Sequence, residues 1–281
     1  MRTPAHQPPP PSPLSRSPHT HEAGATRTTS GAGDRRRWPW SAGHTMLFAA
    51  LWLTGVAALA ILSVAARGSG PFPGDVGLER WMQQLHQPTL VRIVNFASDA
   101  NWPKPAGVIA IAVIVALALA RQIRAAIAAA VSGFGADYLN VTLNGLVKRP
   151  RPYGHNIHAV AHLGLYSYPS GHVTHVLAFY GFLLYLSVVF ARRWPAARPL
   201  WWAARIICLY FILFIGPSRL LEGEHWPSDV LASYLLGALM LVVGIVVYHL
   251  LGMAWARIRE RRQQSGETSA PQAGEGSGGA A

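Results

Sequence analysis

Six apolar segments occupy the central part of the chain, and short polar or basic stretches separate them. They cover residues 45–66, 105–120, 125–147, 173–190, 200–215 and 230–251. An α-helix needs roughly 20 mostly apolar residues to cross a bilayer. The first segment is uncharged and long enough by itself, and the shorter second segment can be extended back through Trp102. The pattern predicts an all-α fold, a transmembrane helical bundle with six spans.

Residues 74–101 have apolar side chains near helical spacing, with polar side chains between them. Such a pattern is typical of amphipathic helices that lie at a membrane surface. We expect one or two helices of this kind at the outer interface, packed against the bundle.

Two tails flank the spans. Residues 1–44 are rich in proline, serine and arginine, and residues 259–281 are first basic and then rich in glycine and serine. Both tails are predicted to be disordered, because they have too few large apolar side chains to form a core. The segment 45–66 is too long for the core of a signal peptide, so we expect it to remain as a span. Residues 45–258 then form a single six-span domain.

The composition supports a membrane protein and argues against a soluble domain. Of the 281 residues, 51% are hydrophobic and only 13% are charged. The net charge is +12, and most of the basic residues are arginines at the ends of apolar segments. This placement fits membrane topology better than a nucleic-acid surface, so the expected partner is the lipid bilayer and not nucleic acid. Cys208 is the single cysteine, which excludes a disulfide framework and a thiolate metal site.

The arginines also predict the orientation of the spans. Four groups, within 35–37, 121–124, 192–198 and 257–262, fall on one side if all six segments cross. Because basic residues favour the cytoplasmic side, we expect both termini in the cytoplasm and a multi-pass protein of the plasma (inner) membrane. The outer loops nevertheless hold Lys148, Arg149, Arg151 and Arg219. Cations kept against the topological preference indicate an anionic ligand.

Two polar clusters lie where the third span ends and the fourth begins. In the first, residues 148–152, prolines stiffen the turn that carries the cations. In the second, Ser170 suits a helix N-cap, and Gly171 lets backbone N–H groups approach an anion at the positive end of a helix. His172 follows directly inside this anion-binding corner.

A third cluster, residues 218–229, separates the fifth and sixth spans. Pro227 suits the first turn of a helix, so His225 is placed just before the sixth span. Asp229 then lies about one turn further in, and we expect its carboxylate to orient the His225 ring. A histidine held by a carboxylate beside an arginine is suited to nucleophilic phosphoryl transfer.

Four further polar residues have a structural interpretation. Asp137, Asn140 and Asn144 lie near one face of the third span, and polar groups in a span normally face the bundle interior or a wet cavity. We expect them to form a buried, hydrogen-bonded stripe leading toward the outer clusters. His175 is interpreted as a satisfied histidine on a helix face.

The remaining charged and histidine residues of the outer loops are assigned no role in chemistry. Glu222 and Glu224 are interpreted as solvated loop charges. His155, His158 and His162 lack the spacing of a metal site, so no metal is expected there.

The second and third clusters together resemble the sequence signature of the type 2 phosphatidic acid phosphatase superfamily. The matching residues are Pro169-Ser170-Gly171-His172, then Ser218-Arg219, five residues, His225, three residues and Asp229. This superfamily includes membrane lipid phosphate phosphatases, soluble acid phosphatases and vanadium haloperoxidases. The likeness covers roughly residues 75–251.

A further family motif consists of a lysine, six residues and Arg-Pro. Arg151-Pro152 match its end, but Asn144 stands where the lysine is expected.

The resemblance implies a metal-independent and cofactor-free hydrolase of phosphoric esters or diphosphates. His225 would be the nucleophile and form a phosphohistidine, Asp229 would hold its ring, and His172 would act as acid and then as base. The residues implied in phosphate binding are Arg151, Arg219, Ser170 and Gly171, with Lys148 as a replacement for the missing lysine. The implied substrate is a membrane lipid phosphate or diphosphate, such as undecaprenyl diphosphate or phosphatidic acid, at the outer face.

Three other functions are compatible with part of these features. A catalytically weak or silent family member, acting as a lipid-binding or partner subunit, is favoured by Asn144. A vanadate haloperoxidase would use the same residues, but its known relatives resemble soluble proteins. A transporter would need polar groups along a path across the membrane, whereas here they collect at one face. The sequence leaves the oligomeric state open.

Overall fold

A computed structural model describes residues 42–154, 156–160 and 166–268, and all regular elements in these ranges are helical. The α-helices are α1 (Ala42–Ala66), α2 (Asp75–Gln83), α3 (Pro88–Asp99), α4 (Pro103–Leu119), α5 (Ile123–Val147), α6 (Gly171–Arg193), α7 (Arg198–Leu221) and α8 (Pro227–Thr268). A 3-10 turn, η1 (Pro195–Ala197), joins α6 to α7. The predicted all-α class is confirmed.

The predicted spans correspond to α1, α4, α5, α6, α7 and α8. All of these except α4 are long and apolar enough by themselves to cross a membrane, and the bent pair of α3 and α4 raises the number of candidates from 5 to 6. α4 has 17 residues and is therefore about 26 Å long. Its axis is bent by 64° from that of α3, so the two helices do not continue each other.

α6 is the central helix of the bundle and contacts α5, α7 and α8. Its most apolar stretch is 67% buried, against 11% for α1, which packs mainly on α8. Buried aromatic side chains of α6, Phe179 and Phe182, share one core with Phe211 of α7 and Tyr248 of α8. The helix that begins at Gly171 is therefore held from several sides, which fixes the position of its first turn.

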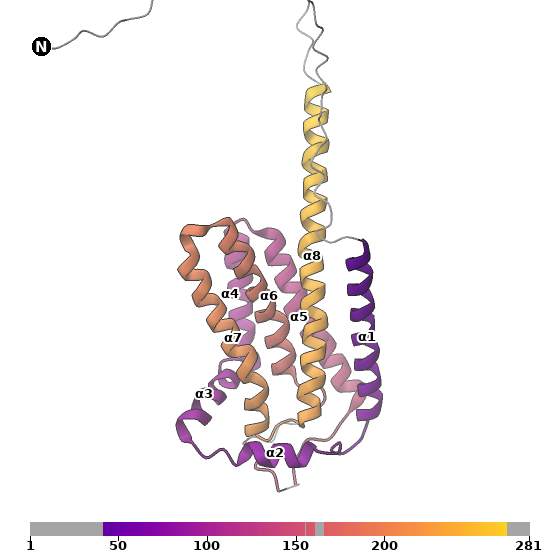
Figure 1. Ribbon diagram of the computed structural model, residues 1–281, viewed down its shortest axis with the longest axis vertical. Helices are drawn as coiled ribbons and strands as arrows, with labels where there is room; N and C mark the ends of the chain where they lie inside the picture. Colours follow the sequence, from indigo (N-terminus) through magenta and orange to yellow (C-terminus); the bar gives the residue numbers. More distant parts are fainter. Residues whose placement is uncertain (1–41, 155, 161–165, 269–281) are drawn as a thin grey trace, which may run out of the picture. The chain divides into compact units, whose positions relative to one another are not determined.

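The segment 74–101 forms two helices, α2 and α3, at the end of the bundle where α8 begins (Figure 1). Both have one buried and one exposed face, but in α2 the buried residues are Asp75 and Glu79, whereas the apolar Trp81 is exposed. In α3, for example, Val94 and Ala97 are buried while Phe96 is 55% exposed. α3 packs against α7, and α2 contacts the ends of α7 and α8. The two helices thus cover the end of the bundle that also carries the three polar clusters.

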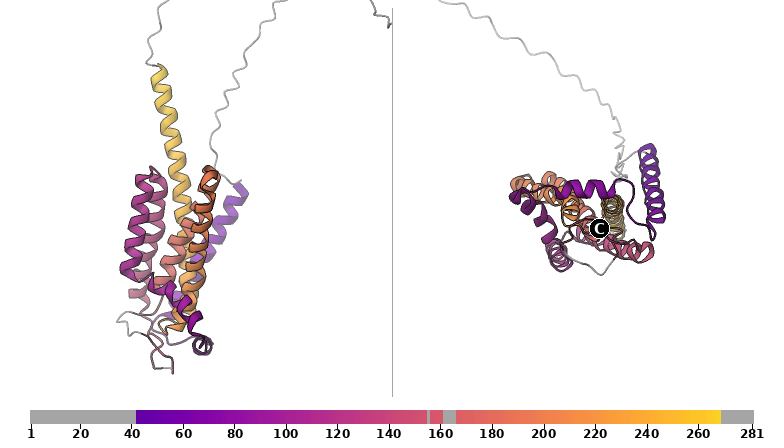
Figure 2. Two further views of the ribbon diagram at one scale, coloured as in Figure 1. Left: turned by 90° about the vertical axis from the view of Figure 1, so that its left-hand side faces the viewer. Right: turned by 90° about the horizontal axis from the view of Figure 1, so that it is seen from below.

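The basic turns lie at the opposite end, where α4 meets α5 and α6 meets α7, and α8 extends beyond the other helices there (Figures 1 and 2). Arg121 and Arg193 mark these turns, and Arg257 lies on the extended part of α8. The predicted arginine group at 35–37 lies outside the described residues. So do residues 1–41 and 269–281 of the two tails, whose disorder stays a prediction.

Candidate active site

Three segments far apart in the sequence are tied together at the end of the bundle that α2 covers. The chain leaves α5 through Lys148, which has a left-handed backbone, and returns to α6 at Gly171. Ser167 closes this loop, since its N–H donates to Arg149 O (2.9 Å) and its hydroxyl to Pro150 O (3.1 Å). The Trp226 indole also donates to Pro150 O (2.9 Å). These bonds bring the residues around positions 150, 170 and 225 into one site.

Gly223 permits the turn between α7 and α8. Its φ is +67°, in the left-handed region that glycine adopts without strain. A Cβ at this position would lie 2.3 Å from His158 O, so no larger residue fits. The N–H of Val160 donates to Glu222 O (2.9 Å) in the same contact. The outer loop around residue 158 therefore lies directly on the turn that precedes His225.

His225 has the geometry of a neutral nucleophile. It is 3% exposed, and its Nδ1 lies 2.6 Å from Ser167 O. A carbonyl oxygen only accepts hydrogen bonds, so Nδ1 carries the proton and Nε2 keeps its lone pair. Burial lowers the pKa of His225 well below the usual value, and the positive charges of Arg151 and Arg219 lower it further. The ring is therefore neutral at neutral pH.

His172 has the complementary tautomer. Its Nδ1 lies 3.4 Å from the guanidinium NH1 of Arg219, which only donates. Nδ1 is therefore the acceptor, and the proton of the neutral ring lies on Nε2. That Nε2 atom is buried and has no hydrogen-bond partner among the described residues. Trp102 at the start of α4 packs edge-on against the ring, with 5.4 Å between ring centroids.

The structure does not show the expected hydrogen bond between Asp229 and the His225 ring. α8 begins at Pro227, directly after His225 as expected, but the Asp229 carboxylate has other partners. The Asp229 carboxylate instead accepts the N–H of Trp226 (3.1 Å) and pairs with Arg149 (2.5 Å). Asp229 thus fixes the backbone next to His225, while Ser167 O orients the ring.

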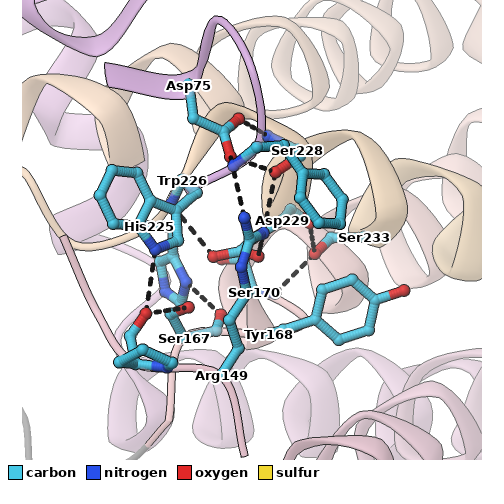
Figure 3. Close-up of polar contacts among 12 residues, drawn as sticks. Asp75, Arg149, Ser167, Tyr168, Ser170, His225, Trp226, Ser228, Asp229 and Ser233 are labelled. Carbon is cyan, nitrogen blue, oxygen red and sulfur yellow. Dashed lines mark hydrogen bonds and ion pairs between the residues drawn. The ribbon is translucent and has the colours of Figure 1, made fainter. Parts of the chain in front are cut away.

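Arg149 is the centre of a buried ionic network that the sequence did not reveal (Figure 3). Its guanidinium is fully buried and pairs with Asp75 of α2 (2.9 Å) as well as with Asp229. Ser228 adds to the network, since its hydroxyl donates to Asp75 (2.7 Å). The network joins α2, the loop after α5 and the start of α8. Of the two arginines in the run 148–152, this one is therefore structural.

Arg151 lines the cavity described below and Arg219 contacts His172, but each of the two arginines pairs with a glutamate. Arg151 contacts the carboxylate (3.2 Å) and the carbonyl oxygen (2.6 Å) of Glu224, and Arg219 forms an ion pair with Glu222. Glu224 is 1% and Glu222 6% exposed, so the interpretation as solvated loop charges is wrong. The two carboxylates are buried because the outer loop covers the turn that holds them. They balance the charge of both arginines inside the site.

The first turn of α6 offers donors to an anion. Ser170 is fully buried, and its N–H donates to the hydroxyl of Ser233 on α8 (2.6 Å), which anchors the helix start. Its own hydroxyl has no partner in the described part of the chain. Gly171 begins the helix, where backbone N–H groups lack intrahelical partners and the helix dipole favours negative charge.

Lys148 and Asn144 do not supply the missing cation. The Lys148 side chain is exposed, and it does not line the cavity described below. The Asn144 amide donates to Tyr166 O (2.8 Å) and Tyr168 O (3.1 Å), so it holds the returning loop in place. The other members of the predicted stripe are also hydrogen-bonded. Asn140 donates to Pro169 O (3.2 Å), and Asp137 pairs with His175.

A buried glutamate on α2 was not singled out from the sequence. Glu79 is fully buried, and neither of its carboxyl oxygens has a partner among the described residues. Burial raises its pKa to about 9, with further contributions from Asp229 and Asp75. The carboxyl group is therefore protonated at neutral pH and adds no charge beside the Arg149 network. A single glutamate in an amphipathic helix gives no sequence signal of this burial.

One cavity of about 550 Å³ brings the chemical groups together. Arg151, His172 and His225 line it at one end, together with Gly171. The start of α4 and the second half of α5 form the remaining wall, which includes apolar side chains such as Phe134. Across the described residues, no group of three histidine, cysteine or acidic side chains is arranged to hold a metal ion. The cavity therefore joins two histidines, an arginine and a helix N-terminus to an apolar wall.

The helical bundle with histidines and arginines at one end agrees with a match to a known protein family. The family model of the PAP2 superfamily matches residues 124–254, from the start of α5 into α8. This segment is a PAP2 superfamily domain, as the resemblance of the motifs indicated. It contains every residue that the sequence singled out for chemistry.

Two curated relatives and one solved structure are similar to this chain. The lipid A 1-phosphatases of Rhizobium etli and Rhizobium johnstonii are both 33% identical over 92 residues, or 33% of this chain. The match spans 34% and 32% of those relatives, about a third of their length. The transmembrane PAP2 type phosphatidylglycerolphosphate phosphatase from Bacillus subtilis has a TM-score of 0.57 and 18% identity, over 69% of this chain and 93% of that one. The structural likeness establishes the fold.

Proposed function

We propose that this protein is a membrane phosphatase that releases phosphate from a lipid phosphate or diphosphate through a phosphohistidine intermediate. One observation carries the proposal: two histidines of opposite tautomer line the same cavity, His225 with a free lone pair on Nε2 and His172 with a proton on Nε2. A nucleophile and a proton donor facing one space are what ester cleavage at phosphorus requires.

The first step follows from these two tautomers. His225 Nε2 attacks phosphorus, and the positive charge that develops on its ring is stabilised by the Nδ1–H bond to Ser167 O. The bond from phosphorus to the lipid oxygen breaks. A bound phosphate next to His172 favours the imidazolium form of that ring, so Nδ1 takes up a proton from solvent in place of the hydrogen bond from Arg219. The imidazolium then gives its Nε2 proton to the leaving oxygen and keeps the proton on Nδ1.

The second step returns the enzyme to its starting state. Water attacks the phosphohistidine, and the neutral His172 takes up one proton of that water. The N–P bond breaks, the lone pair returns to His225 Nε2, and His172 releases its Nδ1 proton to solvent as the phosphate leaves. Arg151, Arg219 and the first turn of α6 stabilise the non-bridging oxygens in both steps, the dominant requirement of phosphoryl transfer. The unpartnered Ser170 hydroxyl and Arg219 Nε support this role, because a phosphate would satisfy both.

The relatives are consistent with a lipid substrate. Two of them are named for lipid A and one for phosphatidylglycerolphosphate. The apolar wall between α4 and α5 suits a lipid chain beside the phosphate. Asn144 favours one other candidate, a silent member that binds lipid phosphates without cleaving them, since the family lysine is missing and the amide is occupied by backbone carbonyls.

Phosphate release separates these two functions. Purified protein in detergent is expected to release inorganic phosphate from lipid phosphates, and 5 mM EDTA is expected to leave the rate unchanged because protein cations neutralise the phosphate. The measurement is colorimetric phosphate release with phosphatidic acid, a phosphorylated saccharolipid and undecaprenyl diphosphate as substrates. Binding of these lipids without release would favour the silent member, and loss of activity with EDTA would contradict metal independence.

We further propose that the site faces the outer side of the plasma (inner) membrane, with both termini in the cytoplasm. The basic turns after α4 and α6 and the basic part of α8 lie at the end opposite to the site, and such residues favour the cytoplasmic side. An alkaline phosphatase fusion after Leu251 is expected to be inactive, and a green fluorescent protein fusion at the same position is expected to fluoresce. The reverse pair of results would overturn this orientation.

A further inference from the structure

A second polar pair lines the same cavity but takes no part in the steps above. His175 lies one turn after His172 on α6, and its Nδ1 contacts both carboxylate oxygens of Asp137 on α5 (3.0 and 3.1 Å). Both residues line the cavity. The His175 ring also stacks on Phe179, with 5.5 Å between ring centroids and 25° between planes. The pair is therefore held in one orientation.

The atoms of Asp137 and His175 that are available to a ligand are hydrogen-bond acceptors. With Asp137 as a carboxylate, His175 donates its Nδ1–H, and Nε2 is left with a lone pair. That Nε2 atom is buried and has no partner in the described ranges, and His175 itself is only 6% exposed. The Asp137 side chain is 39% exposed. A carboxylate and an unpartnered nitrogen inside a membrane-spanning bundle are costly unless a ligand meets them.

The position of Asp137 and His175 places them beside the lipid part of a bound substrate and not beside its phosphate. Asp137 lies two turns before Asn144 on α5, about 10 Å further from the outer loops. The cavity wall around it is apolar, with Phe134 and Val141 on the same helix. A lipid whose phosphorus is at His225 would place the atoms next to its phosphate along this wall.

Resting on the proposed function, we infer that Asp137 and His175 form a subsite for a hydroxyl or amide N–H group close to the phosphate of the lipid. Both acceptors that line the cavity, His175 Nε2 and the Asp137 carboxylate, call for a donor. Hydroxylated glycerolipid, sphingoid and sugar-based lipid phosphates have such a donor. Polyprenyl phosphates and diacyl phosphatidic acid do not, and they leave Nε2 unpaired. The pair thus selects among lipid phosphates.

A substrate pair that differs in one hydroxyl tests this subsite. The kcat/KM of the full-length protein in detergent is measured on 1-oleoyl lysophosphatidic acid and on its 2-deoxy analogue, with a polyprenyl phosphate as a third substrate. We expect about a tenfold preference for the hydroxylated lipid, the usual effect of one buried hydrogen bond. His175→Phe keeps the ring shape and is expected to lower kcat/KM on the hydroxylated lipid only, so that the preference disappears.

Two further variants separate specificity from stability. Asp137→Leu frees the His175 ring and is expected to reduce the preference in the same way, while His86→Ala, in the exposed turn after α2, leaves it unchanged. Equal rates of the wild-type protein on both lipids overturn the subsite, and so does an equal loss on both lipids in His175→Phe. If the wild-type protein cleaves no lipid phosphate at all, the proposed function fails together with the subsite.

Discussion

Replacing His225 with alanine is expected to lower phosphate release by at least ~10³-fold, because no other group can take over covalent attack on phosphorus. The ring is buried, and its single hydrogen bond goes to Ser167 O, so its loss removes the nucleophile and few other contacts. The measurement is kcat/KM on the best lipid substrate, with thermal unfolding in detergent to verify the fold. His86→Ala serves as the matched control, since that histidine is exposed between α2 and α3.

A trapping experiment distinguishes nucleophile from acid. His172→Asn removes the proton donor and base, so a phosphoenzyme formed on His225 is expected to accumulate in this variant with a labelled substrate that has a good leaving group. The label is expected to be acid-labile and base-stable, as a phosphohistidine is, and to be absent from His225→Ala. Label retained in His225→Ala would show that another residue attacks phosphorus.

The second large effect concerns two arginines that are two positions apart. Arg149→Met is expected to destabilise the protein by about 3–5 kcal/mol, because it leaves the buried carboxylates of Asp75 and Asp229 without their positively charged partner. Arg151→Met is expected to leave the protein folded but to lower kcat/KM at least ~100-fold through loss of a phosphate contact. Thermal unfolding in detergent and phosphate release are measured for both variants.

The contrast between the variants is the informative result. In Arg151→Met the Glu224 carboxylate still accepts a hydrogen bond from the Tyr153 hydroxyl, which lies 3.3 Å away. This remaining bond limits the loss of folding stability. A stable Arg149→Met protein would show that the ionic network does not hold α2 to α8. An active Arg151→Met protein would remove this arginine from the phosphate site.

Much of the architecture could be read from the order of apolar and polar residues. The spans, the two amphipathic helices in 74–101 and the helix start at Pro227 depend on local composition and spacing, which the chain carries wherever it folds. The hydrogen-bonded stripe on α5 was also predictable, because polar groups in a span turn toward the protein interior. Local rules gave these elements without knowledge of distant contacts.

The partners of the charged groups were less predictable. Arg149 and Arg151 lie in the same short run, and only the position of Asp75 on α2 decides that Arg149 turns inward. The expected bond between Asp229 and His225 failed although the helix start at Pro227 was predicted, because Arg149 and the N–H of Trp226 take up the Asp229 carboxylate. Glu222 and Glu224 resembled solvated charges because the residues next to them in the sequence do not indicate burial. The loop around His158, which is distant in the sequence, covers them.

The sequence was sufficient to predict a membrane bundle that contains a PAP2 superfamily domain, and to predict that its chemistry is concentrated in the segments around His172 and His225. Hydrophobic length and motif spacing are sufficient for that conclusion. The tertiary structure alone decided which carbonyl orients His225, which arginine is structural, and that Asp137 and His175 meet in the same cavity. These contacts join residues from separate helices and loops, so they exist only once the helices have packed.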